Sequence, residues 1–194
     1  MLSVPVPFKQ LNGLLEDGVY LAIDNGSSCV ISGKEEHLKS FEQKLVSNRI
    51  LCAWLNVDKA MHSPLFDIDA MTAFIAELKF NAPEIPYISC VTGTWITEEN
   101  LSDRAYWSKH LSQSVLFAQG LELLLEEERS LFVEIGIGND VGAIVSRELM
   151  ERNRKERVFG FVRPEGTAST DVYYFSFQLA KIWQSGVSVD WKSW

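Results

Sequence analysis

The sequence predicts a mixed α/β protein whose residues 1–58 form a small ferredoxin-like subdomain of the β-α-β-β-α-β type. Three observations lead to this prediction. Residues 1–57 alternate short apolar runs with helical periodicity in that order. After residue 58, longer helical patterns alternate with single apolar strands, which favours parallel pairing. A length of 194 residues also suffices for one domain or for two small subdomains, each with its own core.

Turn residues separate the elements expected in the first subdomain. Asn25-Gly26-Ser27-Ser28 stands between two β-prone runs and predicts a hairpin. Leu38, Phe41 and Leu45 recur at helical spacing, so they predict the buried face of a helix. The expected strands cover 1–6, 19–24, 29–32 and 50–57, and the expected helices cover 8–15 and 35–46.

Longer elements are expected in the rest of the chain. Ser63 followed by Pro64 predicts the N-cap and the first position of a helix over 65–78. Gly186 marks the end of the last helix. Besides 65–78, the expected helices are 103–111, 115–127, 140–150 and 172–183, and the expected strands are 83–91, 131–135 and 158–162.

Composition and charge exclude several classes of function. A net charge of −8 leaves no basic stripe for a phosphate backbone, so we expect no nucleic-acid partner. No apolar run is long enough to cross a bilayer, which indicates a soluble cytoplasmic protein with no membrane partner. Cys29, Cys52 and Cys90 lie far apart with no ligand spacing, so we expect buried free thiols and no metal site.

Three histidines and one glycine turn are the candidate site residues. Considered alone, His62 before Ser-Pro is more typical of a capping or packing residue than of a catalytic base. His37 is expected to be solvated, and His110 near a helix end can favour the helix dipole. The segment 136–138, Gly-Ile-Gly, follows a strand and opens a helix, where main-chain amides can hold an anion. A tight turn without ligand is favoured, because Val141 stands in place of the third glycine of the dinucleotide motif.

Several phrases, in order, resemble a known family. "VYLAIDNGSSCVISG", "LNVDKAMHSPL", "PEIPYISCVTGTWITEENLSDRAYWSKH", "LFVEIGIG" and "QLAKIWQSGVSVDW" resemble the C-terminal part of the acyltransferase domain of modular polyketide synthases. More remotely, the chain is similar to malonyl-CoA:acyl carrier protein transacylases. The resemblance implies a large α/β-hydrolase-like subdomain with the small ferredoxin-like one inserted in it. It assigns 59–156 to the C-terminal part of the large subdomain and 157–194 to the linker that follows the domain.

The resemblance also implies a reaction and its residues. In the family, a serine in a GHSxG turn takes a malonyl-type group from CoA and passes it to the phosphopantetheine thiol of an acyl carrier protein. His62 matches the catalytic base, and the main-chain carbonyl of His110 matches the group that orients its ring. No GxSxG occurs in this sequence, so the nucleophile is expected in a missing N-terminal half, and the isolated chain is expected to be inactive. The resemblance implies no bound cofactor.

Lys59, Ala60 and Met61 match the family's specificity signature, which ends in His62. A bulky Met61 fills space beside C2 of the acyl group, so we expect a preference for unsubstituted malonyl. Lys59, Cys90 and Ile137 depart from the family pattern, and we expect the core to tolerate the last two.

Two further interpretations stay open at this point. The chain could be a non-catalytic module that binds an acyl carrier protein. It could also self-associate, because the missing strands would leave Leu121, Leu124 and Leu125 exposed.

Overall fold

The chain folds into two compact units, Met1–Glu126 and Glu127–Trp194. The computed structural model describes residues 1–127, 130–155 and 157–193. The expected boundary between the second part and the linker falls at residue 156, which lies outside the described residues.

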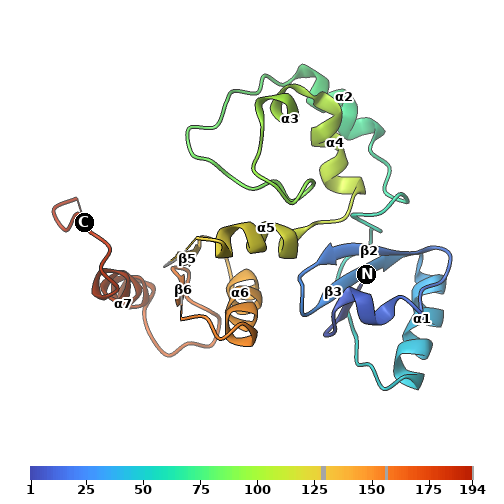
Figure 1. Cartoon of the computed structure of the whole chain (residues 1–194), viewed down its shortest axis with the longest axis horizontal. Helices are drawn as coiled ribbons and strands as arrows, with labels where there is room; N and C mark the ends of the chain where they lie inside the picture. Colours follow the sequence, from blue (N-terminus) through green and yellow to red (C-terminus); the bar gives the residue numbers. More distant parts are fainter. Residues whose placement is uncertain (128–129, 156, 194) are drawn as a thin grey trace. The chain divides into compact units, whose positions relative to one another are not determined.

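The first unit contains a four-stranded antiparallel sheet in the order β2-β3-β1-β4 (Figure 1). The strands are β1 (Leu2–Val4), β2 (Val19–Asp24), β3 (Cys29–Gly33) and β4 (Ala53–Trp54). The predicted hairpin is confirmed, since β2 pairs with β3 and the Asn25 amide donates to the Ser28 carbonyl at 3.0 Å. The strand expected over 50–57 is much shorter, because only Ala53 and Trp54 pair with β1.

One helix covers a face of this sheet. The helix α1 (Glu35–Ser47) contacts β2 and β3 and lies beside them in Figure 1. Leu38, Phe41 and Leu45 are at most 1% exposed, which confirms the predicted buried face. The helix expected over 8–15 is instead a single 3₁₀ turn, η1 (Phe8–Leu11), whose Leu11 side chain is fully buried in the same core.

The rest of the first unit consists of short helices joined by loops. The helices are α2 (Asp69–Glu77), α3 (Glu98–Ser102), α4 (Arg104–Ser112) and α5 (Phe117–Leu125). The helix α3 was not expected, although Thr97 and Asn100 cap each other's backbone as a capping box. The prediction of a strand over 83–91 was wrong. The segment forms only one isolated antiparallel bridge to the described residues, between Ile88 and Trp95.

Ser63 is not the N-cap of α2, which begins only at Asp69. Its hydroxyl donates to the Ala60 carbonyl at 2.7 Å and accepts from the Leu65 amide at 3.3 Å. Ser63 is 1% exposed, so it stabilises a buried turn from the inside.

The second unit contains two parallel strands, β5 (Leu131–Glu134) and β6 (Arg157–Gly160), so the expected parallel pairing is confirmed. The helix α6 (Asp140–Glu151) contacts both strands, and α7 (Asp171–Gln184) contacts β6. Its most buried apolar side chains are Val145, Leu149, Phe159 and Ile182.

Some burial predictions were wrong. Leu121 and Leu125 are only 4% and 6% exposed and Leu124 is half-buried, so these residues do not form the open apolar face expected to drive self-association. Of the free thiols, Cys29 is buried, Cys52 is half-buried and Cys90 is exposed. Ile137 is 95% exposed, so neither Cys90 nor Ile137 is accommodated in the core. Within the described residues, no helix has both the length and the apolar character that a membrane span requires.

Candidate functional site

His62 lies in a tight turn that its neighbours hold in an unusual backbone conformation. Its φ is 55°, in the left-handed region, where a non-glycine residue costs about 1–2 kcal/mol. The His62 amide donates to the Leu111 carbonyl at 2.7 Å, and the adjacent Ser63 hydroxyl stabilises the same turn. Strain of this kind persists only where surrounding contacts fix it, and it is concentrated at functional sites.

The ring of His62 is oriented by a main-chain carbonyl. Its Nδ1 lies 3.3 Å from the carbonyl oxygen of Gln113. A carbonyl only accepts, so this contact favours the tautomer in which Nδ1 carries the hydrogen and donates it. The lone pair of Nε2 is then free to accept a proton from another group.

An open pocket of about 430 Å³ lies beside this ring. His62 is half-buried, so its ring is not enclosed by hydrocarbon side chains. The pocket is lined by Tyr20 and Leu21 of β2, His62, Pro64, Val91, and residues Ser112, Gln113, Ser114 and Leu116 between α4 and α5. A reactant could therefore reach the imidazole from this side.

His110 lies close enough to His62 for their charges to interact, but it is held by aromatic contacts. Its ring stacks on Trp107 with centroids 5.7 Å apart and meets Tyr106 edge-on at 4.9 Å. Burial, and then the positive charge of His62, lower the pKa of His110. Its Nε2 is buried with no hydrogen-bond partner among the described residues, which fits a neutral ring. The carbonyl observed beside His62 belongs to Gln113, further along the chain than His110.

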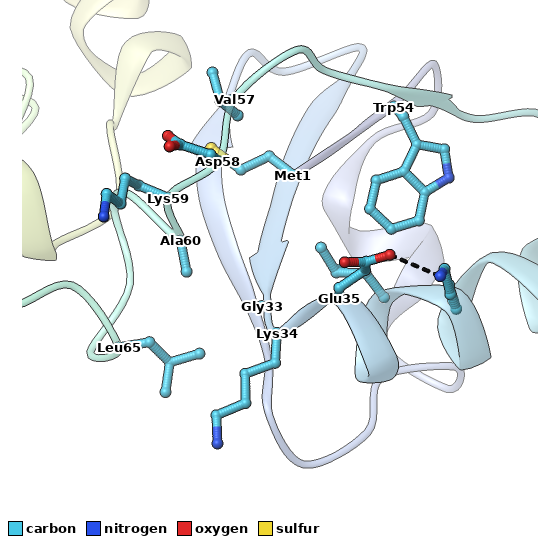
Figure 2. Close-up of a pocket in the computed structure, with 12 residues that line it drawn as sticks. Met1, Gly33, Lys34, Glu35, Trp54, Val57, Asp58, Lys59, Ala60 and Leu65 are labelled. Carbon is cyan, nitrogen blue, oxygen red and sulfur yellow. Dashed lines mark ion pairs between the residues drawn. The ribbon is translucent and has the colours of Figure 1, made fainter.

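The residues of the predicted specificity signature lie in different surroundings. Lys59 and Ala60 line a second pocket of about 710 Å³ (Figure 2). Met61 instead packs, half-buried, against the cluster formed by Met1, Ala22 and Val30. Met61 thus lies against the sheet, whereas Lys59 and Ala60 line the second pocket.

Positive charge is in excess around this second pocket. In Figure 2 the segment 57–60 lies on one side, and Trp54 and the start of α1 lie on the other. Lys39 pairs with Glu35 at 2.6 Å, so these two charges neutralise each other. Of the other charged lining residues, Lys34 and Lys59 outnumber Asp58, and no ion pair to either lysine is present in the described part of the chain. The pocket therefore suits an anionic group better than the chain's charge of −8 suggests.

The glycine turn before α6 carries an anion from its own chain. The carboxylate of Glu134, at the end of β5, accepts from the Val141 amide at 3.1 Å and from the Gly142 amide at 2.9 Å. A Cβ at Gly142 would lie 2.6 Å from this carboxylate, so a larger residue there would displace the Glu134 side chain. The helix N-terminus is already satisfied, which agrees with a tight turn without external ligand. Sequence reasoning missed Glu134, although an acidic residue that ends a strand before a glycine turn was the available signal.

Across residues 1–127, 130–155 and 157–193, no group of three or more His, Cys, Asp and Glu side chains is placed to hold a metal ion.

Comparison with known proteins gives one consistent match. Residues 7–189 match the family model described as acyl transferase domain. The chain is 29% identical over 203 aligned positions to mycoketide-CoA synthase of Mycobacterium tuberculosis, covering 100% of the chain and 5% of that protein. It is 28% identical over 199 aligned positions to the pikromycin polyketide synthase component PikAII of Streptomyces venezuelae, covering 99% of the chain and 5% of that protein.

Solved structures give the same result. The acyl transferase domain of ZmaA superposes with a TM-score of 0.87 at 36% identity, over 98% of the chain and 45% of that domain. The acyl transferase domain of SpnD, in complex with 2-(pent-4-yn-1-yl)malonyl, gives a TM-score of 0.90 at 26% identity, over 95% of the chain and 46% of that domain. The chain thus spans less than half of these solved domains and a small part of the synthases that it matches.

Proposed function

Since this chain belongs to the acyl transferase domain family, we propose that it supplies the general base of a polyketide synthase acyltransferase. The proposed reaction loads a malonyl-type unit from CoA onto the phosphopantetheine arm of an acyl carrier protein, in the cytoplasm. The nucleophilic serine comes from outside these 194 residues, because no GxSxG occurs among them. Residues 1–58 act as the ferredoxin-like subdomain, 59–156 as part of the large subdomain and 157–194 as the linker.

One observation carries this proposal: the His62 ring is held at Nδ1 by the Gln113 carbonyl and lies beside an open pocket. In this arrangement Nε2 takes the proton from the serine hydroxyl as its oxygen attacks the thioester carbonyl of the acyl-CoA. The same nitrogen then returns the proton to the sulfur of the leaving CoA thiolate. The second half-reaction repeats these steps with the carrier-protein thiol as the attacking group.

The orienting role expected of the His110 carbonyl passes, in our proposal, to Gln113. The Gln113 carbonyl is the one within hydrogen-bond distance of Nδ1. The ring of His110 stays packed against Tyr106 and Trp107 and does not line the pocket beside His62.

The acyl group proposed here is unsubstituted malonyl. The SpnD domain is in complex with a substituted malonyl group, which supports a malonyl-type substrate for the present chain. Met61 packs half-buried against Met1, Ala22 and Val30, and in our proposal it takes the space that a smaller side chain would leave for a C2 substituent. Lys34 and Lys59 give the second pocket an excess of positive charge, which suits a carboxylate or a phosphate of such a substrate.

A chimeric domain tests the proposal. The segment of the ZmaA acyl transferase domain that matches this chain is replaced by this chain, and self-acylation and transfer to a carrier protein are measured with malonyl-CoA and methylmalonyl-CoA. We expect transfer with malonyl-CoA to exceed transfer with methylmalonyl-CoA. The change His62→Gln should lower the rate of acylation about 10²–10⁴-fold, because the serine loses its general base.

His37→Gln is the matched control, because His37 lies on α1 and does not line the pocket beside His62. An active chimera whose rate is the same with His62→Gln would contradict the catalytic role. Tight binding of a carrier protein by the isolated chain, together with an inactive chimera, would instead favour the non-catalytic module.

A further inference from the structure

The edge of the small sheet next to His62 is interrupted by a β-bulge. In the pairing of β2 with β3, Leu21 lies opposite Ile31 and Ile23 lies opposite Val30, so Ala22 has no partner on β3. A bulge leaves its extra residue unpaired and redirects its groups, and bulges are frequent beside active sites. Because β2 is the edge strand in the order β2-β3-β1-β4, the groups released by this bulge are free to bind another segment.

The segment that binds there is the one that carries Gln113. The Val115 amide donates to the Ala22 carbonyl at 2.8 Å, and the Asp24 amide donates to the Val115 carbonyl at 2.9 Å. These two bonds form a parallel bridge between Ile23 and Val115. They fix Val115 but leave the preceding residues to be fixed by another contact.

Ser114 provides that contact. Its hydroxyl donates to the Leu21 carbonyl at 2.6 Å, a short hydrogen bond between residues 93 positions apart. Leu21 is the residue before the bulge, so Ser114 and Val115 are tied to two consecutive carbonyls of β2. Ser114 also immediately follows Gln113, whose carbonyl lies 3.3 Å from Nδ1 of His62. A rotation of the peptide between these two residues would therefore move that carbonyl away from the ring.

We propose that Ser114 is a positioning residue, whose hydrogen bond to the bulged edge of β2 fixes the Gln113 carbonyl and so selects the Nδ1-protonated tautomer of His62. The bulge sets the register, the Ser114 hydroxyl fixes the peptide, and the carbonyl accepts from the ring. The significance of this tautomer for acyl transfer rests on the proposed function, whereas the tautomer itself does not.

NMR of the full 194-residue chain tests this inference. The ¹⁵N shifts of the ring nitrogens report which nitrogen carries the hydrogen, and with three histidines in the chain the His62 signals are assignable by substitution. When the His62 ring is neutral, we expect the Nδ1-protonated tautomer to be the majority species. In Ser114→Ala we expect it to fall to a minority, because the Gln113 carbonyl is released.

Ser112→Ala is the matched control, since Ser112 lines the same pocket but is not hydrogen-bonded to β2. It should leave the tautomer unchanged, and Ser114→Thr, which keeps the hydroxyl, should restore the majority of the Nδ1-protonated form. If Ser114→Ala does not fold, Ser114→Cys replaces it, because a thiol is a weaker donor of similar size; an intermediate tautomer fraction is then expected.

An unchanged tautomer in a folded Ser114→Ala or Ser114→Cys variant would overturn the inference. So would a majority of the Nε2-protonated form in the unsubstituted chain. A tautomer shift in Ser114→Ala, combined with an active chimera that is insensitive to His62→Gln, would retain the positioning role and reject the proposed function.

Discussion

At the scale of single residues, the candidate site joins two imidazoles with different environments. His62 is half-buried beside an open pocket and has its Nδ1 on a carbonyl. His110 is packed between Tyr106 and Trp107, with a buried Nε2 that has no described partner. A proton on His110 would be poorly solvated and would repel a proton on His62. The pair is therefore arranged so that a proton on His110 is disfavoured beside His62.

This arrangement predicts a pH dependence of folding stability. The pKa of His110 is lowered from 6.5, first by burial and then by His62, so the unfolded chain binds this proton more readily than the folded chain. The contribution of His110 to the free energy of unfolding is therefore fully present above about pH 6.5 and decreases as the pH falls toward the folded-state pKa. Urea unfolding at several pH values should show this decrease, and His110→Gln should reduce it.

His62→Gln should raise the pKa of His110, measured by NMR, without restoring its ordinary value, because burial is the larger cause. A pKa of His110 at or above its ordinary value would contradict the packing described here.

Contacts that depend on neighbouring residues could be predicted from the sequence, whereas contacts between distant segments could not. His62 was selected as the candidate base because its phrase resembles the family signature, and the buried face of α1 was predicted from helical spacing and is confirmed. The carbonyl of Gln113 could not be found in this way, because a carbonyl has no residue type and its position depends on a pairing between segments 93 positions apart. Ser63 was misassigned as an N-cap, because Ser-Pro before an apolar run is compatible with both a cap and a buried turn.

At the scale of elements, Glu134 shows how a strand and the following helix are joined. Its carboxylate accepts two main-chain amides at the start of α6, where the helix dipole favours a negative charge. We expect Glu134→Gln to lower the stability of the second unit by about 1–2 kcal/mol, because the amide side chain keeps one acceptor oxygen and loses the charge. The α6 amide signals followed by NMR during urea unfolding measure this change. Glu151→Gln is the control: Glu151 pairs with Arg147 on the exposed surface of α6, and its loss should cost at most about 0.5 kcal/mol. Equal effects of the two changes would show that Glu134 is not a cap.

The order of most elements, and the extent of several helices, could be predicted from periodicity, whereas the extent of some strands could not. The hairpin, α1, α4, α6 and α7 begin within two residues of their expected positions, because each combines a clear apolar period with turn or cap residues. The segment 83–91 has the composition of a strand, but its described pairing is a single bridge at Ile88, because strand formation needs a partner that composition does not reveal. The strand β4 is limited to Ala53 and Trp54 for the same reason.

At the scale of the whole molecule, the two units differ in how completely they bury their apolar side chains. The core of the first unit includes Leu2, Ile31 and Phe41 at 0% exposure, whereas the most buried apolar side chains of the second unit, Leu149 and Phe159, retain 3%. The sheet of the second unit consists of the two parallel strands β5 and β6. Parallel sheets ordinarily need helices on both faces to be stable. We therefore expect the first unit to have the higher local stability.

Native-state hydrogen exchange measures this difference. Amides in the interior of α1, which packs Leu38, Phe41 and Leu45 into the core, should exchange at least about tenfold more slowly than those in the interior of α7, where Ile182 is 6% exposed and Phe177 is 50% exposed. Phe41→Ala should remove this advantage, at a cost of about 3–5 kcal/mol in the first unit, because it leaves a cavity in the best-packed region. Val46→Ala on the same helix should have little effect, since Val46 is 63% exposed. Equal protection of α1 and α7, lost together on Phe41→Ala, would mean that the two units unfold as one cooperative body and that burial within each unit does not set its stability.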